Sequence, residues 1–144
     1  MLRKVSFSNF YSFEKKQEIG FLAKKKTSYS YANTISGDQI TEIASVIGAN
    51  ASGKTNVMRF FSFISYFVCM SNKNESASLN NIPFNTFYNN NKVSDFYVEY
   101  ESNNKIYFYS LSIKENIVLK EALMFKTKVK NAKNAGYLCE KGTK

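Results

Sequence analysis

An octapeptide containing two glycines constrains this chain more than any other feature, because each of its fixed positions has a physical role. Residues 48–55 read G-A-N-A-S-G-K-T and fit the pattern G-x-x-x-x-G-K-[ST]. Gly48 and Gly53 permit backbone torsions that a Cβ would block, so that successive N–H groups can point at one anion. Lys54 adds a compact positive charge, and Thr55 adds a hydroxyl that can ligate Mg²⁺. The octapeptide therefore predicts a phosphate-binding loop, or P-loop.

The segments on either side of the loop support this interpretation. Residues 42–47 read E-I-A-S-V-I, and this β-branched apolar run predicts a buried parallel strand. After the loop, apolar residues recur at helical spacing, namely Val57, Phe60, Phe61, Ile64, Phe67 and Val68. This stripe predicts a helix that packs on a sheet and directs its positive end at the loop. An ordinary glycine turn before a helix is the alternative, and it leaves the order of strand, loop and helix unexplained.

Aromatic residues are concentrated in the predicted helix and allow two interpretations. They either line a ligand pocket or pack in the core, and they are Phe60, Phe61, Phe63, Tyr66 and Phe67. Because their spacing is helical, core packing is the preferred interpretation.

The composition is that of a folded domain or part of one. The 144 residues are 44% hydrophobic and 16% aromatic, which excludes wholesale disorder. No apolar run approaches the ~20 residues of a membrane span, and the first residues alternate like a strand, so we expect a cytoplasmic protein without a membrane partner. The sequence contains no histidine, and Cys69 and Cys139 are its only cysteines. A zinc site or a Cys–His nucleophile therefore cannot be built from this chain alone.

The net charge of +9 allows a nucleic-acid partner without requiring one. All basic residues except Arg3 and Arg59 are lysines, whereas surfaces that read bases tend to use the fork of arginine. Solvated lysine faces are therefore the preferred interpretation. The patches that would bind nucleic acid are Lys24–Lys26 and the tail lysines Lys126, Lys128, Lys130 and Lys133.

Alternating patterns predict a hairpin near the start of the chain and an antiparallel meander in its second half. The hairpin strands are residues 5–10 and 17–22, with a turn within residues 9–16. The meander occupies about residues 95–125, and its strands are residues 95–100, 106–113 and 117–125. Turns are expected at residues 103–104 and 114–116. Polar loops are expected at residues 24–39 and 71–81, and a basic polar tail at residues 126–144.

Several of these segments together resemble ABC-type ATPases of the chromosome-maintenance and recombination-repair kind. Residues 5–13, V-S-F-S-N-F-Y-S-F, are similar to the opening x-N-F-R-S-F of that group, with Tyr11 at the position of the usual arginine. The P-loop followed by Asn56 is similar to the form G-A-N-A-S-G-K-T-N of bacterial relatives, with Ala51 in place of the glycine of repair enzymes. Weaker similarities are found at Pro83-Phe84, in the meander strands, at residues 118–123 and at residues 137–141. The chain looks most like the AAA/ABC-type ATPases of abortive-infection, retron-associated and OLD-like phage-defence systems.

The resemblance implies an α/β fold: a P-loop NTPase, namely the first lobe of an ABC-type ATPase head with an antiparallel β-meander subdomain. Residues 1–144 would be that N-terminal lobe, and we expect the remainder of the ATPase domain to be absent from this sequence. No apolar strand here ends in Asp-Glu, and no Leu-Ser-Gly-Gly-like signature loop is found. We therefore identify no catalytic residue in this chain, and we expect the carboxylate for ATP hydrolysis to come from elsewhere.

The resemblance also implies a ligand, partners and a function. ATP and Mg²⁺ would lie between two heads of a homodimer or higher oligomer. The residues expected to bind the nucleotide are Gly48, Asn50, Ala51, Ser52, Gly53, Lys54, Thr55 and Asn56. Lys54 would bind the terminal phosphates, Thr55 the Mg²⁺ ion, and Asn56 would lie near the α-phosphate.

Three functions remain open from the sequence. The first is an ATP-binding lobe that controls an anti-phage effector, such as a nuclease, through ATP-dependent dimerisation. The second is a DNA-repair or chromosome-organising ATPase of the same fold. The third is a nucleotide-binding assembly module without turnover.

Overall fold

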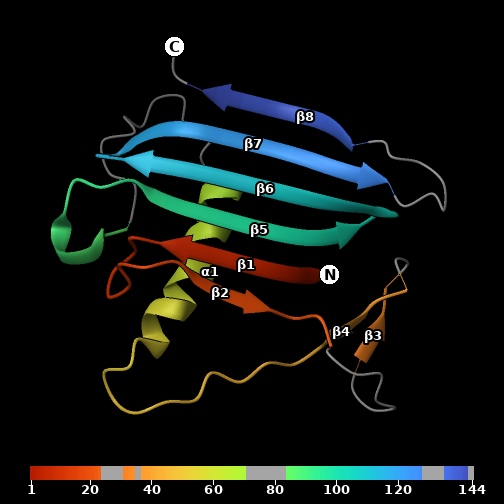
Figure 1. Cartoon of the computed structure of the whole chain (residues 1–144), viewed down its shortest axis with the longest axis horizontal. Coiled ribbons are helices and arrows are strands. Elements are labelled where there is room, and N and C mark those ends of the chain that lie inside the picture. Colours follow the sequence, from red (N-terminus) through yellow and green to blue (C-terminus); the bar gives the residue numbers. More distant parts are fainter. Residues whose placement is uncertain (24–30, 35–36, 71–83, 128–134, 143–144) are drawn as a thin grey trace.

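A six-stranded antiparallel sheet forms the centre of the molecule, and one helix crosses one of its faces (Figure 1). The computed structural model describes residues 1–23, 31–34, 37–70, 84–127 and 135–142. The strands follow the order β2-β1-β5-β6-β7-β8. Their bounds are β1 Leu2–Ser8, β2 Gln17–Gly20, β5 Ser94–Ser102, β6 Lys105–Lys114, β7 Ile117–Thr127 and β8 Ala135–Gly142. The remaining elements are β3 Tyr31–Asn33 and β4 Gln39–Thr41, which pair with each other, helix α1 Lys54–Met70 and the 3-10 helix η1 Phe87–Asn89.

The predicted N-terminal hairpin is confirmed. Strands β1 and β2 are antiparallel, with Phe7 opposite Gln17. The N–H of Asn9 donates to the carbonyl of Glu14 at 3.1 Å, and this bond closes the turn between the two strands. The turn carries Tyr11 and places it beside the P-loop helix.

The predicted meander is also confirmed, since β5, β6 and β7 pair antiparallel in sequence order. The β5–β6 connection has Asn103 and Asn104 at φ 48° and 62°, and the β6–β7 connection has Glu115 and Asn116 at φ 49° and 63°. Two successive positive φ angles match the right-handed twist of the flanking strands. Asparagine tolerates this left-handed backbone better than most residues.

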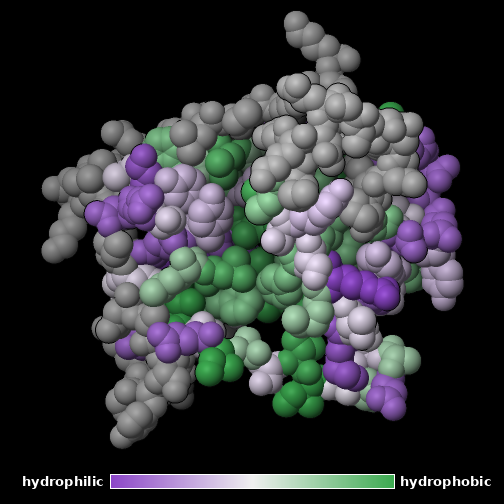
Figure 2. All heavy atoms as spheres, turned by 180° about the vertical axis from the view of Figure 1, so that it is seen from behind, coloured by the Kyte–Doolittle hydropathy of each residue, from purple (hydrophilic) through white to green (hydrophobic). Residues whose placement is uncertain are grey.

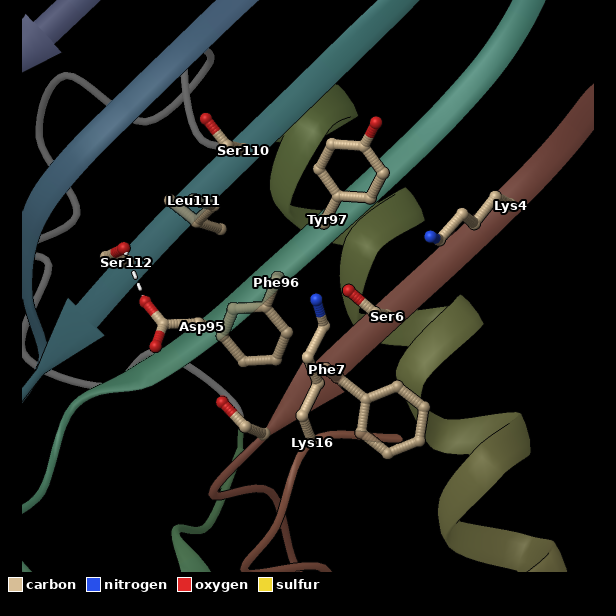
Figure 3. A pocket seen from close by; sticks show the side chains of 11 residues that line it. Lys4, Ser6, Phe7, Lys16, Asp95, Phe96, Tyr97, Ser110, Leu111 and Ser112 are labelled. Atoms are coloured by element: carbon tan, nitrogen blue, oxygen red, sulfur yellow. Dashed lines mark hydrogen bonds between the residues drawn. The ribbon is translucent and has the colours of Figure 1, made fainter. Parts of the chain in front are cut away.

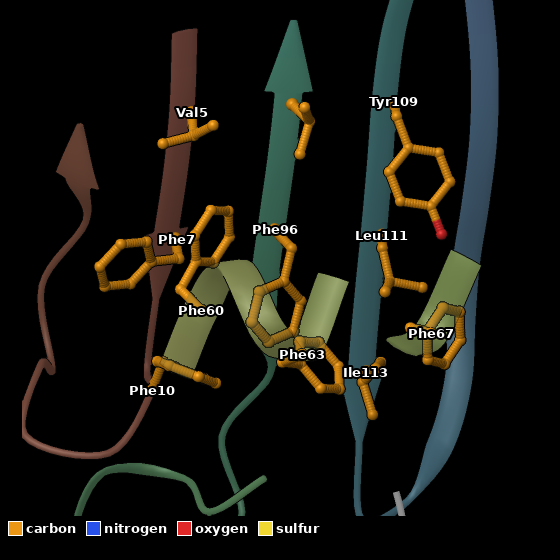
Figure 4. Close-up of a cluster of buried hydrophobic side chains, with 11 residues drawn as sticks. Val5, Phe7, Phe10, Phe60, Phe63, Phe67, Phe96, Tyr109, Leu111 and Ile113 are labelled. Carbon is orange, nitrogen blue, oxygen red and sulfur yellow. The ribbon is translucent and has the colours of Figure 1, made fainter. Parts of the chain in front are cut away.

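An aromatic core lies between α1 and the sheet (Figure 4). The ring of Phe60 is fully buried and stacks on Phe7, with ring centroids 4.8 Å apart. Phe63 and Phe67 follow at helical spacing and are also buried, so core packing is confirmed for this face of α1. The prediction is wrong for Tyr66 and Val68, which are 45% and 53% exposed. A helix advances about 100° per residue, which rotates these two positions away from the sheet. No helix among the described residues is long and apolar enough to cross a membrane.

A bulge in β1 ties the small β3–β4 hairpin to the main sheet. The register of β1 against β5 shifts between Leu2 and Lys4, with Arg3 as the extra residue. The Arg3 guanidinium contacts Asp38 at 2.7 Å, Glu99 at 2.9 Å and Glu101 at 3.0 Å, and the Arg3 side chain is only 7% exposed. Burial disfavours the charged form, but the bonds to Asp38 and Glu99 outweigh it and raise the pKa of Arg3.

The expected strand at residues 42–47 is wrong. This segment forms no strand and is exposed, with Ile43 82%, Val46 46% and Ile47 91% accessible. Every strand pair among the described residues is antiparallel, so no parallel neighbour is present there to receive the segment. A β-branched run without a partner strand keeps its backbone hydrogen bonds with water and its side chains in solvent.

Two expected irregular segments contain strands. The sequence predicts residues 31–33 and 39 within a loop, but they belong to β3 and β4, which pair with Ala32 opposite Ile40. The predicted polar tail contains β8, which extends the sheet beside β7. Several other predictions lie outside the described residues, namely those for Lys24–Lys26, residues 71–81, Pro83, Lys128, Lys130 and Lys133.

Candidate nucleotide-binding site

The octapeptide leads directly into the N-terminus of α1, as the sequence predicts. The amides of Gly53, Lys54 and Thr55 donate to no backbone carbonyl within the part of the chain that the structure describes. The first bonds of the helical turn run from Asn56 and Val57 to the Gly53 carbonyl, at 2.9 and 3.0 Å. N–H groups without an intrahelical acceptor at the start of this 17-residue helix form an anion-binding end. The helix dipole adds partial positive charge at the same place.

Gly53 occupies a position that other residues would strain. Gly53 has φ +91°, and a Cβ placed on it would lie 2.6 Å from a ring carbon of Phe13. A Cβ on Gly48 would lie 2.7 Å from the Ser52 hydroxyl oxygen. Ala51 also adopts a left-handed backbone, with φ 62°. The loop conformation therefore depends on Gly53, whereas the exposed Ser52 side chain can rotate away from a Cβ on Gly48.

Lys54 extends back across the loop. Its Nζ donates to the carbonyl oxygens of Gly48 at 2.7 Å and Ala49 at 2.5 Å. These acceptors are neutral, whereas a bound phosphate would offer charged oxygens and stronger, charge-assisted bonds. The ammonium group is thus held where an anion in the loop can compete for it.

The remaining predicted residues lie around this centre. Asn50 and Ser52 are exposed in the turn of the loop, and the Ser52 amide donates to the Ala49 carbonyl at 3.3 Å. In this conformation the Ser52 amide is used inside the loop, unlike the amides of Gly53 and its two successors. Thr55 is exposed in the first turn of α1, where its hydroxyl can ligate a cation.

Asn56 links the loop to residues that sequence reasoning did not assign to the site. Its Nδ2 donates to Ser12 Oγ at 2.8 Å, and its Oδ1 accepts from Arg59 Nη1 at 3.1 Å. The Arg59 guanidinium lies over the Tyr11 ring, 4.9 Å from the centroid. Helix α1 thus brings the Arg59 guanidinium next to Tyr11. At the position of Tyr11, the ATPases that this chain resembles usually carry an arginine. The opening motif pointed to Ser12, but nothing in the sequence pointed to Arg59.

A hollow of about 420 Å³ lies on the sheet face opposite α1 (Figure 3). Its lysines, Lys4 and Lys16, face Glu18 at 2.8 and 3.9 Å. The hydrogen bond from Lys4 lowers the pKa of Glu18 and keeps its carboxylate charged. Asp95 adds another carboxylate and accepts a 2.7 Å hydrogen bond from Ser112. Mixed charges at this hollow make it a poorer anion site than the P-loop.

Comparison with known proteins agrees with the geometry of the loop. The sequence model of one family, described as "AAA domain, putative AbiEii toxin, Type IV TA system", matches residues 43–136. The matched range covers more than half of the chain and includes the P-loop, α1 and strands β5 to β7. No curated protein matches the chain. This chain therefore belongs to that family of AAA domains, which are P-loop domains that generally bind ATP with Mg²⁺.

Proposed function

We propose that this chain is the ATP-binding lobe of an ABC-type ATPase and controls an anti-phage effector through ATP-dependent dimerisation. The observation that carries the nucleotide site is the row of open amides at Gly53, Lys54 and Thr55, beside the Lys54 ammonium. The family description refers to a putative AbiEii toxin of a Type IV toxin–antitoxin system, and this supports a connection with an effector of that kind.

Each residue of the loop has a defined part in this proposal. The open amides donate to the phosphate oxygens, and Lys54 moves from its carbonyl partners to the terminal phosphates. The Thr55 hydroxyl holds Mg²⁺, which, when bound, neutralises phosphate charge and polarises the terminal phosphoryl group. Asn56 stays near the α-phosphate through its bond to Ser12.

The surface around the loop supports dimerisation. Residues 42–52 are exposed, and Ile43 and Ile47 are 82% and 91% accessible immediately before the P-loop. Met58, in the second turn of α1, is 57% exposed. Figure 2 shows apolar surface gathered on the side of the molecule that carries α1. A second head placed over the nucleotide would remove these side chains from water at roughly 25 cal/mol per Å² of apolar area.

Titration calorimetry with ATP and Mg²⁺ tests the nucleotide site. We expect Lys54→Ala to weaken ATP binding at least about tenfold, since it removes a charge-assisted bond of about 1.5–3 kcal/mol. Lys114→Ala is the matched control, because this exposed lysine lies at the end of β6, outside the P-loop. Equal affinities of wild type and Lys54→Ala would contradict the assignment.

Sedimentation with and without ATP and Mg²⁺ tests dimerisation. We expect wild type to associate only with nucleotide, and Ile47→Asp to bind nucleotide while remaining monomeric. A wild-type protein that stays monomeric at saturating ATP would contradict the dimer.

Phage plating on cells that express the complete protein tests the defence role. We expect protection with Lys114→Ala and none with Lys54→Ala. Equal protection by both variants would exclude ATP-dependent control. Turnover that DNA stimulates would favour the repair or chromosome-organising alternative instead.

A further inference from the structure

The hollow of about 420 Å³ on the sheet face opposite α1 has no part in the proposed nucleotide site. Alternation along β1, β5 and β6 turns the apolar side chains toward α1 and leaves polar ones on this face. Two serines of β1 and two of β6 line it, namely Ser6, Ser8, Ser110 and Ser112. These small side chains lie between longer ones such as Lys4 and Tyr97, and the recess between them is of the size that small ligands occupy.

Ser6 is the residue of the hollow that most clearly points to a ligand. It is only 3% exposed, yet its hydroxyl makes no hydrogen bond within the described part of the chain. Figure 3 shows this hydroxyl close to the ammonium groups of Lys4 and Lys16, on the side of β1 that lines the hollow. Buried hydroxyls are normally hydrogen-bonded, because an unpaired one costs free energy. A polar group of a ligand seated in the hollow would supply the partner of Ser6.

Charges of both signs border the hollow and cancel each other. Lys4 and Lys16 lie at its β1 side, and Glu18 contacts them at 2.8 and 3.9 Å. Asp95 lies across from them on β5 (Figure 3). Two ammonium groups are thus matched by two carboxylates. An anion would be repelled by the carboxylates and a cation by the lysines, so the local charge favours a ligand without net charge.

The hydrogen-bonding capacity that these groups leave unused is also of both kinds. Asp95 accepts one bond from Ser112 at 2.7 Å, and Lys4 donates one to Glu18 at 2.8 Å. A carboxylate offers about four acceptor sites and an ammonium group three donors, so both can bind further partners. A ligand hydroxyl can accept from an ammonium group while it donates to a carboxylate. A zwitterion would instead have to replace the bond between Lys4 and Glu18, whereas hydroxyls leave it intact.

Tyr97 adds a flat apolar surface to this polar lining. Its ring lies between Lys4 and Ser110 in Figure 3, and its hydroxyl donates to Glu99 at 3.4 Å. An aromatic side chain of this kind presents an apolar body and a polar tip. Sugars have the complementary form, since the C–H groups of a sugar ring make an apolar face and its hydroxyls make a polar edge. The lining therefore suits a sugar ring that packs on Tyr97 and is hydrogen-bonded around its edge.

We propose that this hollow binds a neutral, polyhydroxylated ligand of the sugar class. Its hydroxyls bind Ser6, Lys4 and Asp95, and the C–H face of its ring packs on Tyr97. Because the sheet separates the hollow from α1, this second site does not depend on the proposed nucleotide site. A sugar and a nucleotide can therefore bind the same chain at the same time.

NMR titration of the isotope-labelled chain with two probes, glucose and maltose, tests the site. We expect the sugars to shift the backbone amides of β1, β5 and β6 that border the hollow, and not those of residues 48–55. Ser6→Ala should weaken sugar binding about fivefold, since it removes one hydrogen bond, and Asp95→Asn should weaken it by a similar factor. Ser102→Ala is the matched control, because this exposed serine lies at the end of β5, outside the hollow.

Other results would overturn the proposal in distinguishable ways. If neither sugar shifts the amides around the hollow, or if both Ser6→Ala and Asp95→Asn bind like wild type, the sugar site is wrong. Inorganic phosphate and glycine are the comparison probes for an anion and a zwitterion, and stronger binding of either at the hollow overturns the sugar class. Lys54→Ala should bind both sugars like wild type, and weaker binding would overturn the independence of the two sites. Circular dichroism checks that each variant is folded.

Discussion

The side-chain amide of Asn56 donates a 2.8 Å hydrogen bond to the hydroxyl of Ser12, which lies 44 residues earlier in the chain. This bond joins the first turn of α1 to the turn between β1 and β2. Both elements also line one hollow of the surface, through Tyr11 and Ser12 on one side and Asn56 on the other. In the proposed function, the position of the nucleotide therefore depends on the N-terminal hairpin as well as on the loop itself.

Removing this bond should affect binding more than folding. We expect Ser12→Ala to lower the free energy of unfolding by about 0.5 kcal/mol, at the low end for a hydrogen bond because the site is exposed. ATP affinity should fall several-fold, since Asn56 loses its fixed orientation. Ser112→Ala removes a similarly exposed bond, to Asp95, on the opposite face and should leave affinity unchanged. Urea denaturation and calorimetry measure the two effects, and an equal loss of affinity in both variants would contradict the linkage.

The two glycines Gly53 and Gly20 should respond differently to alanine. Gly53→Ala places a Cβ on a backbone with φ +91° and 2.6 Å from Phe13, so we expect a loss of about 1–2 kcal/mol in stability together with weaker ATP binding. A Cβ on Gly20 in β2 would meet no atom within 4 Å, so Gly20→Ala should change stability by no more than about 0.5 kcal/mol. Thermal denaturation compares them. Equal stabilities of the two variants would show that the loop relaxes around the new methyl group.

Substitutions on opposite sides of α1 should differ in their effect on the free energy of unfolding. Phe60→Ala removes a fully buried ring that stacks on Phe7, and we expect a loss of about 3–5 kcal/mol. Met58→Ala, on the exposed side of the same helix, should cost no more than about 0.5 kcal/mol in the monomer. Urea titration of both variants provides the comparison. A large effect at Met58 without nucleotide would indicate that this side is already covered in solution.

Stability should fall in alkaline solution, partly because of Tyr97. Burial, and then the nearby charge of Glu99, raise the pKa of Tyr97 from 10.0 to about 12. Between these values the phenol ionises in the unfolded chain but not in the folded one, so unfolding becomes easier as pH rises from about 10 to 12. Tyr97→Phe should flatten this part of the curve of unfolding free energy against pH. Tyr88→Phe serves as the exposed control, and identical slopes in wild type and Tyr97→Phe would refute the assignment.

The antiparallel parts of the fold could be predicted because their signals are local. The β5–β6 turn needs a left-handed backbone, and Asn103-Asn104 provides it between two alternating runs. The P-loop could be predicted for the same reason, because its pattern lies within residues 48–55 and Gly53 has the left-handed backbone that glycine favours.

Other elements depend on partners that no local pattern reveals. Residues 42–47 have the composition of a buried strand, but a strand forms only where another strand pairs with it. β8 has the opposite property, since its sequence carries no clear alternation of apolar and polar residues and the strand is defined by its pairing with β7. The contact of Arg59 with Tyr11 was missed because the two residues meet only in the folded chain.

The exposed segment from Ile43 to Ile47 has a consequence for handling the protein. It combines β-branched residues, low charge and high accessibility, which are the properties of an aggregation-prone window. Purified chain should therefore precipitate more readily as its concentration rises, and Ile47→Lys should delay that precipitation. Selection for solubility during expression would favour such substitutions at the surface proposed for dimerisation. A variant chosen for its high solubility should consequently be the first one tested for ATP-dependent dimerisation.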